Sequence, residues 1–188
     1  IAKHCAELGQ WDKAMILIQK VLQSRGPDAG LLNRLGMLAG EMGDTDREIK
    51  FYREAAKASS WSGSLFNLAL AYKRQKQYEK AHSALYEAIE REPDGPYWIL
   101  KAQLFEQQKL LRERDEALQE ASELMDSVEE MNDWELFWYE KAARMEGNED
   151  LLADIEEEKE SRKKKGLKIS PGEQNLPEIR SAIQSRGE

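Results

Sequence analysis

Three residues of this chain belong to the types that most often act as a general base, a thiol nucleophile or a soft metal ligand: His4, His82 and Cys5. His4 and Cys5 are neighbours and would point about 100° apart on a helix, so they cannot meet in one site. Cys5 falls on an apolar helical stripe, which is typical of a buried thiol. The acids of 133–140 (DWELFWYE) lie among aromatic residues, without a histidine or a metal-ligand spacing. We therefore expect no catalytic centre, no metal site and no cofactor.

Sequence motifs of known enzyme classes are absent as well. The chain contains no glycine-rich phosphate loop, no H-E-x-x-H and no G-x-S-x-G. A single cysteine cannot form an internal disulfide, which favours a reducing compartment and hence the cytoplasm. No run of 18 apolar residues occurs, so no membrane-spanning helix is expected. The composition predicts a protein that binds other molecules rather than an enzyme.

Charge is unevenly distributed along the chain. The net charge is −8, and residues 120–160 contain 16 acidic and 3 basic residues. Residues 161–188 carry a net positive charge. Nucleic acid is not an expected partner, because its binding requires a positive stripe that neutralises phosphates. We interpret the acidic segment as a solvated helical face, with a docking surface for a basic partner as the alternative.

The elements that would position any binding residues repeat along the chain. Residues 36–55 resemble residues 69–88 at an offset of 33, and the same spacing occurs about four times. In 63–75 apolar residues fall at i, i+3, i+4 and i+7, which predicts an amphipathic helix, and 78–93 predicts a second one. A pair of such helices cannot bury its apolar face alone, so it must stack on neighbouring pairs.

These units resemble the tetratricopeptide repeat family, whose pattern is W-x2-L-G-x2-Y, then A-x3-F, then A and P. LNRLGMLA at 32–39 matches the first part as L-x2-L-G-x2-A, and LFNLALAY at 65–72 matches it as L-x2-L-A-x2-Y. AHSAL at 81–85 with Pro93 completes the second copy, and WILKAQLF at 98–105 begins another. The resemblance implies an all-α fold, a right-handed superhelical solenoid of antiparallel helix pairs.

Three positions depart from the family pattern. Glu48 stands where the second helix of a unit carries alanine, and Lys101 stands where leucine belongs. Ala117 comes three residues late in the fourth unit, which predicts that the first helix of that unit is longer.

We expect three regions in the chain. Residues 1–125 form about four tetratricopeptide-like units, the first truncated at its N-terminus, and residues 126–166 form a degenerate fifth unit that caps the stack. Residues 167–188 form a loop and a short helix at 176–186. That helix is too short to be stable alone, so we expect it to dock in the groove of its own copy or of a second copy, or on the cap. Because Ile1 lies within a helical pattern, we also expect the chain to be a piece of a longer protein.

The family resemblance implies that the first helices of successive units line a concave groove that binds a peptide. The predicted groove residues are Asn33, Arg34, Met37, Phe66, Asn67, Leu70, Lys73, Arg74, Ile99, Leu100 and Gln103. We expect the apolar members to form an exposed floor and the basic members to edge it. The clamp by which one subgroup holds the carboxylate of chaperone tails is matched only at Asn67, so that ligand is not expected.

The expected function is a protein–protein interaction scaffold that holds an apolar or amphipathic peptide segment in this groove. A homodimer formed through the C-terminal tail is a further expectation. The alternative function is a structural spacer or dimerisation module within a larger enzyme or chaperone-like chain. Binding of single-stranded RNA, as in the related pentatricopeptide repeats, is disfavoured by the acidic charge.

Overall fold

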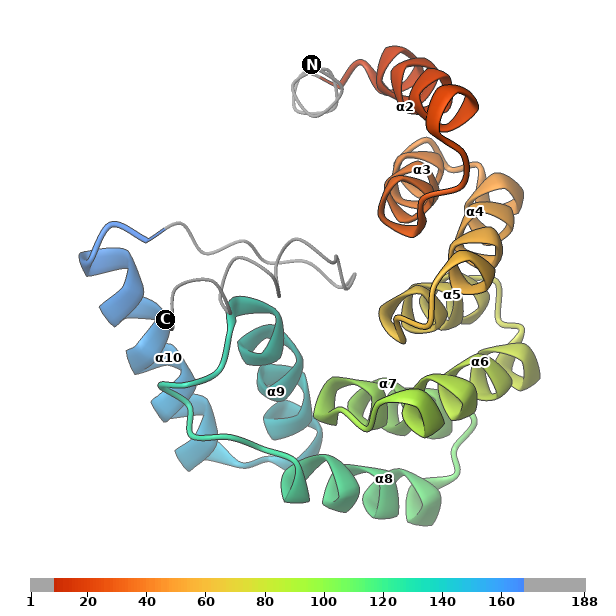
Figure 1. The fold of residues 1–188 in the computed structure, drawn as a ribbon. Helices are drawn as coiled ribbons and strands as arrows, with labels where there is room; N and C mark the ends of the chain where they lie inside the picture. Colours follow the sequence, from red (N-terminus) through yellow and green to blue (C-terminus); the bar gives the residue numbers. More distant parts are fainter. Residues whose placement is uncertain (1–8, 168–188) are drawn as a thin grey trace. The chain divides into compact units, whose positions relative to one another are not determined.

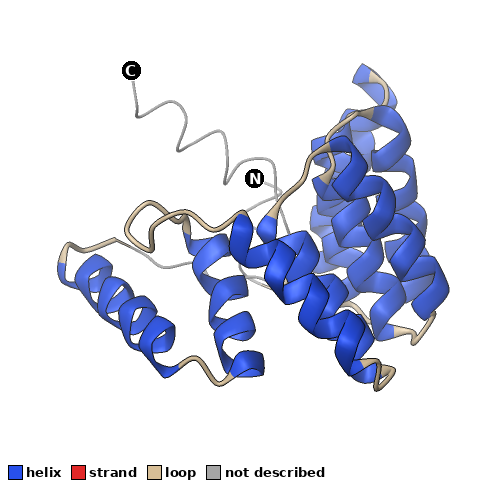
Figure 2. Ribbon diagram, turned by 90° about the horizontal axis from the view of Figure 1, so that it is seen from below, coloured by secondary structure: helices blue, strands red, loops and turns tan. Residues whose placement is uncertain are grey.

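The computed structural model describes residues 9–167 of the chain (Figure 1). These residues form α-helices joined by turns and loops, and no strand occurs among them (Figure 2). They divide into two compact units, 9–91 and 92–167. Short turns join the helices of the pairs α3–α4, α5–α6 and α7–α8, which pack on each other, and this confirms the expected all-α class of antiparallel helix pairs.

The first unit consists of α2 (Trp11–Arg25), α3 (Ala29–Glu41), α4 (Thr45–Ala58), α5 (Gly63–Arg74) and α6 (Tyr78–Arg91). Each helix packs on the next one in the sequence, and α3 also contacts α5. Asp28 and Asp44 cap α3 and α4, because their carboxylates accept hydrogen bonds from backbone N–H groups in the first turns. Gly43, at φ 75°, supplies the left-handed backbone of the turn between α3 and α4.

A glycine allows the close crossing of α3 and α4. A Cβ atom on Gly36 would lie 2.6 Å from a ring carbon of Tyr52, which is fully buried. Ala69 and Ala81 are also fully buried, as expected for the small residues of the next helix pair. Small side chains at these positions therefore let large aromatic and aliphatic side chains fill the space beside each crossing.

The second unit consists of α7 (Gly95–Gln107), α8 (Leu111–Glu123), α9 (Asp133–Glu146) and α10 (Glu149–Lys164). Helix α7 packs on both α8 and α9, and α9 packs on α10. The hydroxyl of Tyr139 on α9 donates a hydrogen bond to the carbonyl oxygen of Ala121 on α8 (2.7 Å) and occupies the space where Gly95 lacks a side chain. The expectation of a longer α7 is wrong, because α7 has 13 residues, as α3 has. Ala117 instead lies one turn further along α8.

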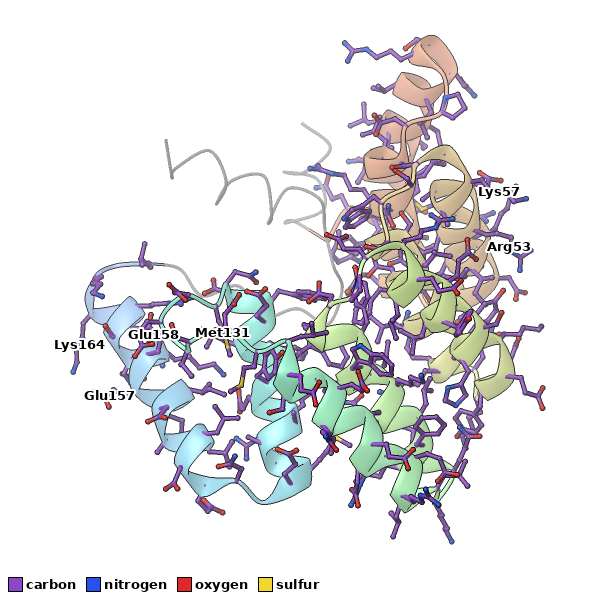
Figure 3. All side chains as sticks on the ribbon, turned by 60° about the horizontal axis from the view of Figure 1, so that its bottom comes forward. Arg53, Lys57, Met131, Glu157, Glu158 and Lys164 are labelled. Atoms are coloured by element: carbon purple, nitrogen blue, oxygen red, sulfur yellow. The ribbon has the colours of Figure 1, made fainter. Side chains whose placement is uncertain are left out.

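Ion pairs join α9 and α10. The guanidinium of Arg162 donates hydrogen bonds to the carboxylates of Asp133 (2.9 Å) and Glu158 (2.6 Å) and to the carbonyl oxygen of Met131 (2.6 Å). Lys159 forms an ion pair with Glu140. Part of the acidic segment is therefore used within the unit, and it is not only a solvated face. Figure 3 shows Glu158 on the side of α10 near Met131, while Glu157 points outward.

No helix in the described part of the chain is long and apolar enough to cross a lipid bilayer. The predicted terminal helix at 176–186, and with it the tail-mediated homodimer, lies outside the described residues, as do His4 and Cys5. The division at residues 125 and 166 stays a prediction.

Candidate functional site

The predicted groove residues come from three helices in two units. Asn33, Arg34 and Met37 lie on α3, and residues 66–74 lie on α5, which contacts α3. Ile99, Leu100 and Gln103 lie on α7 in the second unit. The structure thus brings the α3 and α5 members together within one compact unit.

A buried polar network links α3 to α5. The side-chain amide of Asn33 donates hydrogen bonds to the hydroxyl of Ser64 and to the carbonyl oxygen of Ala29, both at 2.8 Å. The amide of Asn67 in turn donates to the Oδ1 atom of Asn33 (3.4 Å). Asn33, Ser64 and Asn67 are all fully buried, and buried polar groups need such partners. The two asparagines therefore hold neighbouring helices together.

The apolar members of the predicted groove are also buried. Phe66, Ile99 and Leu100 are 0% exposed and Leu70 is 1% exposed, so the expectation of an exposed apolar floor is wrong for these side chains. Helix α5 contacts α3, α4 and α6 and is buried from Gly63 to Tyr72, while α7 contacts α8 and α9. The sequence periodicity marked one apolar face of each helix, but neighbouring helices cover more than one face.

The remaining predicted residues keep some exposed surface. Arg34, Met37, Lys73 and Gln103 are half-buried, and Arg74 is exposed. Whether these residues bind a peptide stays a prediction.

Arg74 forms an ion pair with Glu48 of α4, whose side chain is 1% exposed. Burial raises the pKa of the Glu48 carboxyl, and the charge and hydrogen bond of Arg74 oppose this rise. Gly40 leaves room for the carboxylate, because a Cβ atom there would lie 2.7 Å from the Oε1 atom of Glu48. The sequence shows Glu48 as a departure from the family pattern, but it did not indicate Arg74 as the partner of Glu48. An acid at a core position requires a nearby cation, and this rule could have pointed to Arg74.

A second candidate site, which the sequence reasoning missed, surrounds the C-terminal half of α4. A cavity of about 830 Å³ is lined by the charged residues Arg53, Lys57, Glu87 and Arg91 and by the apolar residues Leu65 and Leu68, among others. Figure 3 shows Arg53 and Lys57 projecting to the same side of the helix. These residues come from three helices that meet only in the folded unit, so no single motif indicates them.

The basic side chains at this cavity have different partners. The guanidinium of Arg53 donates a hydrogen bond to the hydroxyl of Tyr72 (2.9 Å). Arg91 pairs with Glu87 (2.6 Å) and donates to the carbonyl oxygens of Ala56 (3.4 Å) and Ser59 (3.3 Å) at the end of α4. Arg91 therefore connects α6 to the end of α4 beside the cavity, and Tyr72 orients Arg53 without neutralising it.

Residues 29–60 and 62–94 each match the sequence profile of the tetratricopeptide repeat. The chain contains tetratricopeptide repeats. The helix pairs α3–α4 and α5–α6 are these two repeats, so Arg34, Met37, Lys73 and Arg74 lie on first helices of the repeats. Arg53, Lys57 and Arg91 lie on second helices.

Solved structures share the fold of the chain. A crystal structure of MamA is 15% identical with a TM-score of 0.60, covering 88% of this chain and 96% of MamA. The structure of MamA 41-end from Desulfovibrio magneticus RS-1 is 18% identical with a TM-score of 0.61, covering 86% of this chain and 93% of that one. The APC/C hetero-tetramer Cut9–Hcn1 is 22% identical with a TM-score of 0.56, covering 65% of this chain and 25% of the matched one. No curated protein matches the sequence. At these identities the likeness shows the fold, and it confirms the helical-repeat class.

Proposed function

We propose that this chain is a protein-interaction scaffold, and that the first helices of its two tetratricopeptide repeats contact a peptide segment of a partner protein. The observation that carries the proposal is the pair of consecutive repeats at 29–94. The contact between α3 and α5 places their side chains on one surface before a partner binds, and a preorganised surface loses little entropy on binding. One structure of similar fold, Cut9–Hcn1, is itself a complex of two proteins.

The side chains left on this surface favour an amphipathic peptide over a purely apolar one. Met37 offers an apolar contact, and Arg34, Lys73 and Arg74 are basic. Because Phe66 and Leu70 are buried, polar contacts would contribute a larger share of the binding energy than the sequence suggested. Gln103 of α7 belongs to the proposed contact residues of the second unit.

A role without catalysis remains part of the proposal. Among residues 9–167, no three side chains of His, Cys, Asp or Glu come together in a way that could hold a metal ion. His82 is half-buried on α6 and belongs to no such group within the described residues.

Selection of binders from a random peptide library displayed on phage, with the 188-residue chain as bait, tests the proposal. Peptides that bind should lose about tenfold in affinity when Lys73→Glu and Met37→Gln are introduced together. The control is Lys20→Glu, a charge reversal on the exposed face of α2. A library that yields no binder, or binders equally affected by the control, would contradict the proposal and favour a structural spacer.

A further inference from the structure

We infer that the C-terminal half of α4 and the side chains around it form a second docking surface, which binds an acidic peptide segment carrying a large apolar side chain. The surface consists of the 830 Å³ cavity at Arg53, Lys57 and Arg91 and of a neighbouring cavity of about 540 Å³. Its residues come from all five helices of the first unit, but none of them is Arg34, Met37, Lys73 or Arg74, so it is distinct from the α3–α5 surface proposed above.

The charge of the larger cavity favours an anionic group. Within residues 9–167 Lys57 forms no ion pair, and the hydrogen-bond partner of Arg53 is the neutral hydroxyl of Tyr72. Arg53 and Lys57 are four residues apart on α4, so their like charges repel each other. A bound carboxylate would relieve this repulsion and accept hydrogen bonds from both side chains. Glu87 does not supply this anion, because it pairs with Arg91.

Arg53 is also held in place for such a contact. The hydrogen bond from its guanidinium to Tyr72 crosses from α4 to α5, and Tyr72 is a buried residue of the repeat core. A side chain that is already ordered loses less conformational entropy when it binds a ligand. Tyr72 is therefore a positioning residue for Arg53.

The two cavities differ in chemistry and share one residue. The smaller cavity is lined by the apolar residues Leu22, Pro27, Leu32 and Ala58 and by the polar residues Gln23 and Glu54, and Lys57 lines both cavities. Both volumes lie within the range of about 300–1,000 Å³ that is usual for ligand sites. A peptide that passes over Lys57 would place a carboxylate beside Arg53 and an apolar side chain among Leu22, Pro27 and Leu32.

A protein segment fits these features better than a nucleic acid. Nucleic-acid binding needs several cations along a phosphate backbone, whereas this surface has two cations, Arg53 and Lys57, that form no ion pair within residues 9–167, next to a largely apolar cavity. The acidic residues of a second copy of this chain are the competing occupant, and the experiment below separates the two.

Fluorescence anisotropy with labelled peptides on the 188-residue chain provides the test. The probes carry one leucine and a run of glutamates, separated by about one to six glycines to span up to about 20 Å. At least one spacing should bind, and Arg53→Glu and Lys57→Glu should each weaken its binding about tenfold. Tyr72→Phe keeps both charges but releases Arg53, so we expect a smaller, roughly threefold loss.

The matched control is Lys76→Glu. Lys76 lies in the turn between α5 and α6, at the opposite end of these helices from the cavity. Its φ is 56°, and lysine and glutamate both carry a Cβ atom, so the substitution adds no new backbone strain. This variant should bind the peptide as the wild type does, and circular dichroism should show that all four variants are folded. Lys73→Glu should also leave the affinity unchanged, which makes the result independent of the α3–α5 proposal.

Three results would overturn the inference. The first is that no probe of any spacing binds. The second is that Lys76→Glu weakens binding as much as Lys57→Glu does, which would indicate only long-range electrostatic attraction. The third is that replacing the leucine of the probe with glycine leaves its affinity unchanged. A fourth result would assign the surface to a second copy instead: light scattering detects a dimer of the wild-type chain that Lys57→Glu dissociates.

Discussion

Arg74 on α5 forms an ion pair with Glu48 on α4, which stands where the tetratricopeptide pattern has alanine. The carboxylate is buried and the guanidinium is partly exposed, with 41% of the Arg74 side chain accessible. The pair therefore connects the second helix of one repeat to the first helix of the next. A buried charge of this kind depends on its partner, and this dependence can be measured.

Removal of the partner should destabilise the fold more than removal of both residues. Arg74→Ala leaves the Glu48 carboxylate buried without its cation, and we expect a loss of about 1–3 kcal/mol, below the cost for a fully buried pair because Arg74 is partly exposed. The double variant Glu48→Ala, Arg74→Ala restores the family residue at 48 and should lie close to the wild type. Urea denaturation monitored by circular dichroism measures both. A double variant as unstable as Arg74→Ala would show that the arginine acts through contacts other than this pair.

The same carboxyl predicts a pH dependence. Because burial raises the pKa of Glu48 above its usual 4.5, the folded state binds the proton more tightly than the unfolded state does. The contribution of Glu48 to stability is therefore greatest below the unfolded pKa and is lost as pH rises through the folded pKa. Glu48→Gln cannot titrate, so its free energy of unfolding should increase relative to that of the wild type as pH rises from about 4 to 7.

Urea denaturation at several pH values tests this sign. Glu79→Gln, at an exposed acid in the first turn of α6, provides the control and should show no comparable trend. A difference between Glu48→Gln and wild type that shrinks as pH rises would mean that Arg74 outweighs burial at this site.

The crossing of α3 and α4 predicts a steric effect. Gly36→Ala places a Cβ against the ring of Tyr52, and overpacking of this kind costs about 1–3 kcal/mol. Gly30→Ala, in the same helix, brings the same gain in helix propensity but meets only the Asp28 carboxylate at 3.3 Å. Thermal unfolding should show Gly36→Ala as the less stable variant. Equal melting temperatures would contradict the tight crossing.

The acidic residues of α10 should differ in their contribution to stability, because some form ion pairs within the unit and others contact only solvent. Glu158 is part of the Arg162 cluster, whereas Glu157 is exposed (Figure 3). Glu158→Gln should cost about 0.5–1 kcal/mol and raise amide exchange in α10, and Glu157→Gln should change neither. Arg162→Gln should cost more, about 1–3 kcal/mol, because the hydrogen bonds to Asp133 and Met131 are lost as well. Hydrogen-exchange mass spectrometry resolves these effects by segment, and equal protection in all three variants would contradict the cluster.

Local patterns were sufficient to predict the helices. The 33-residue spacing and the glycine at 43 are visible in the sequence, and so are the small residues at 36, 69 and 81. Each acts within one pair of consecutive helices, so its role follows from periodicity and turn chemistry. The burial of Phe66 and Leu70 could not be predicted in the same way. A helix in a repeat protein is covered by preceding and following units, and the amount of coverage depends on crossing distances that side-chain packing sets.

The amino-acid sequence by itself determined that residues 29–94 form tetratricopeptide repeats, because a helix pair with one apolar stripe must stack on its neighbours to bury it. Only the tertiary structure decided which polar groups meet. Asn33 lies 34 residues from Asn67, Glu48 lies 26 residues from Arg74, and Arg53 lies 38 residues from Arg91 across one cavity. Such contacts depend on the rotation of each helix about its own axis. A turn of 100° per residue is enough to bury a side chain or to expose it, and only packing against the neighbouring helices selects that rotation.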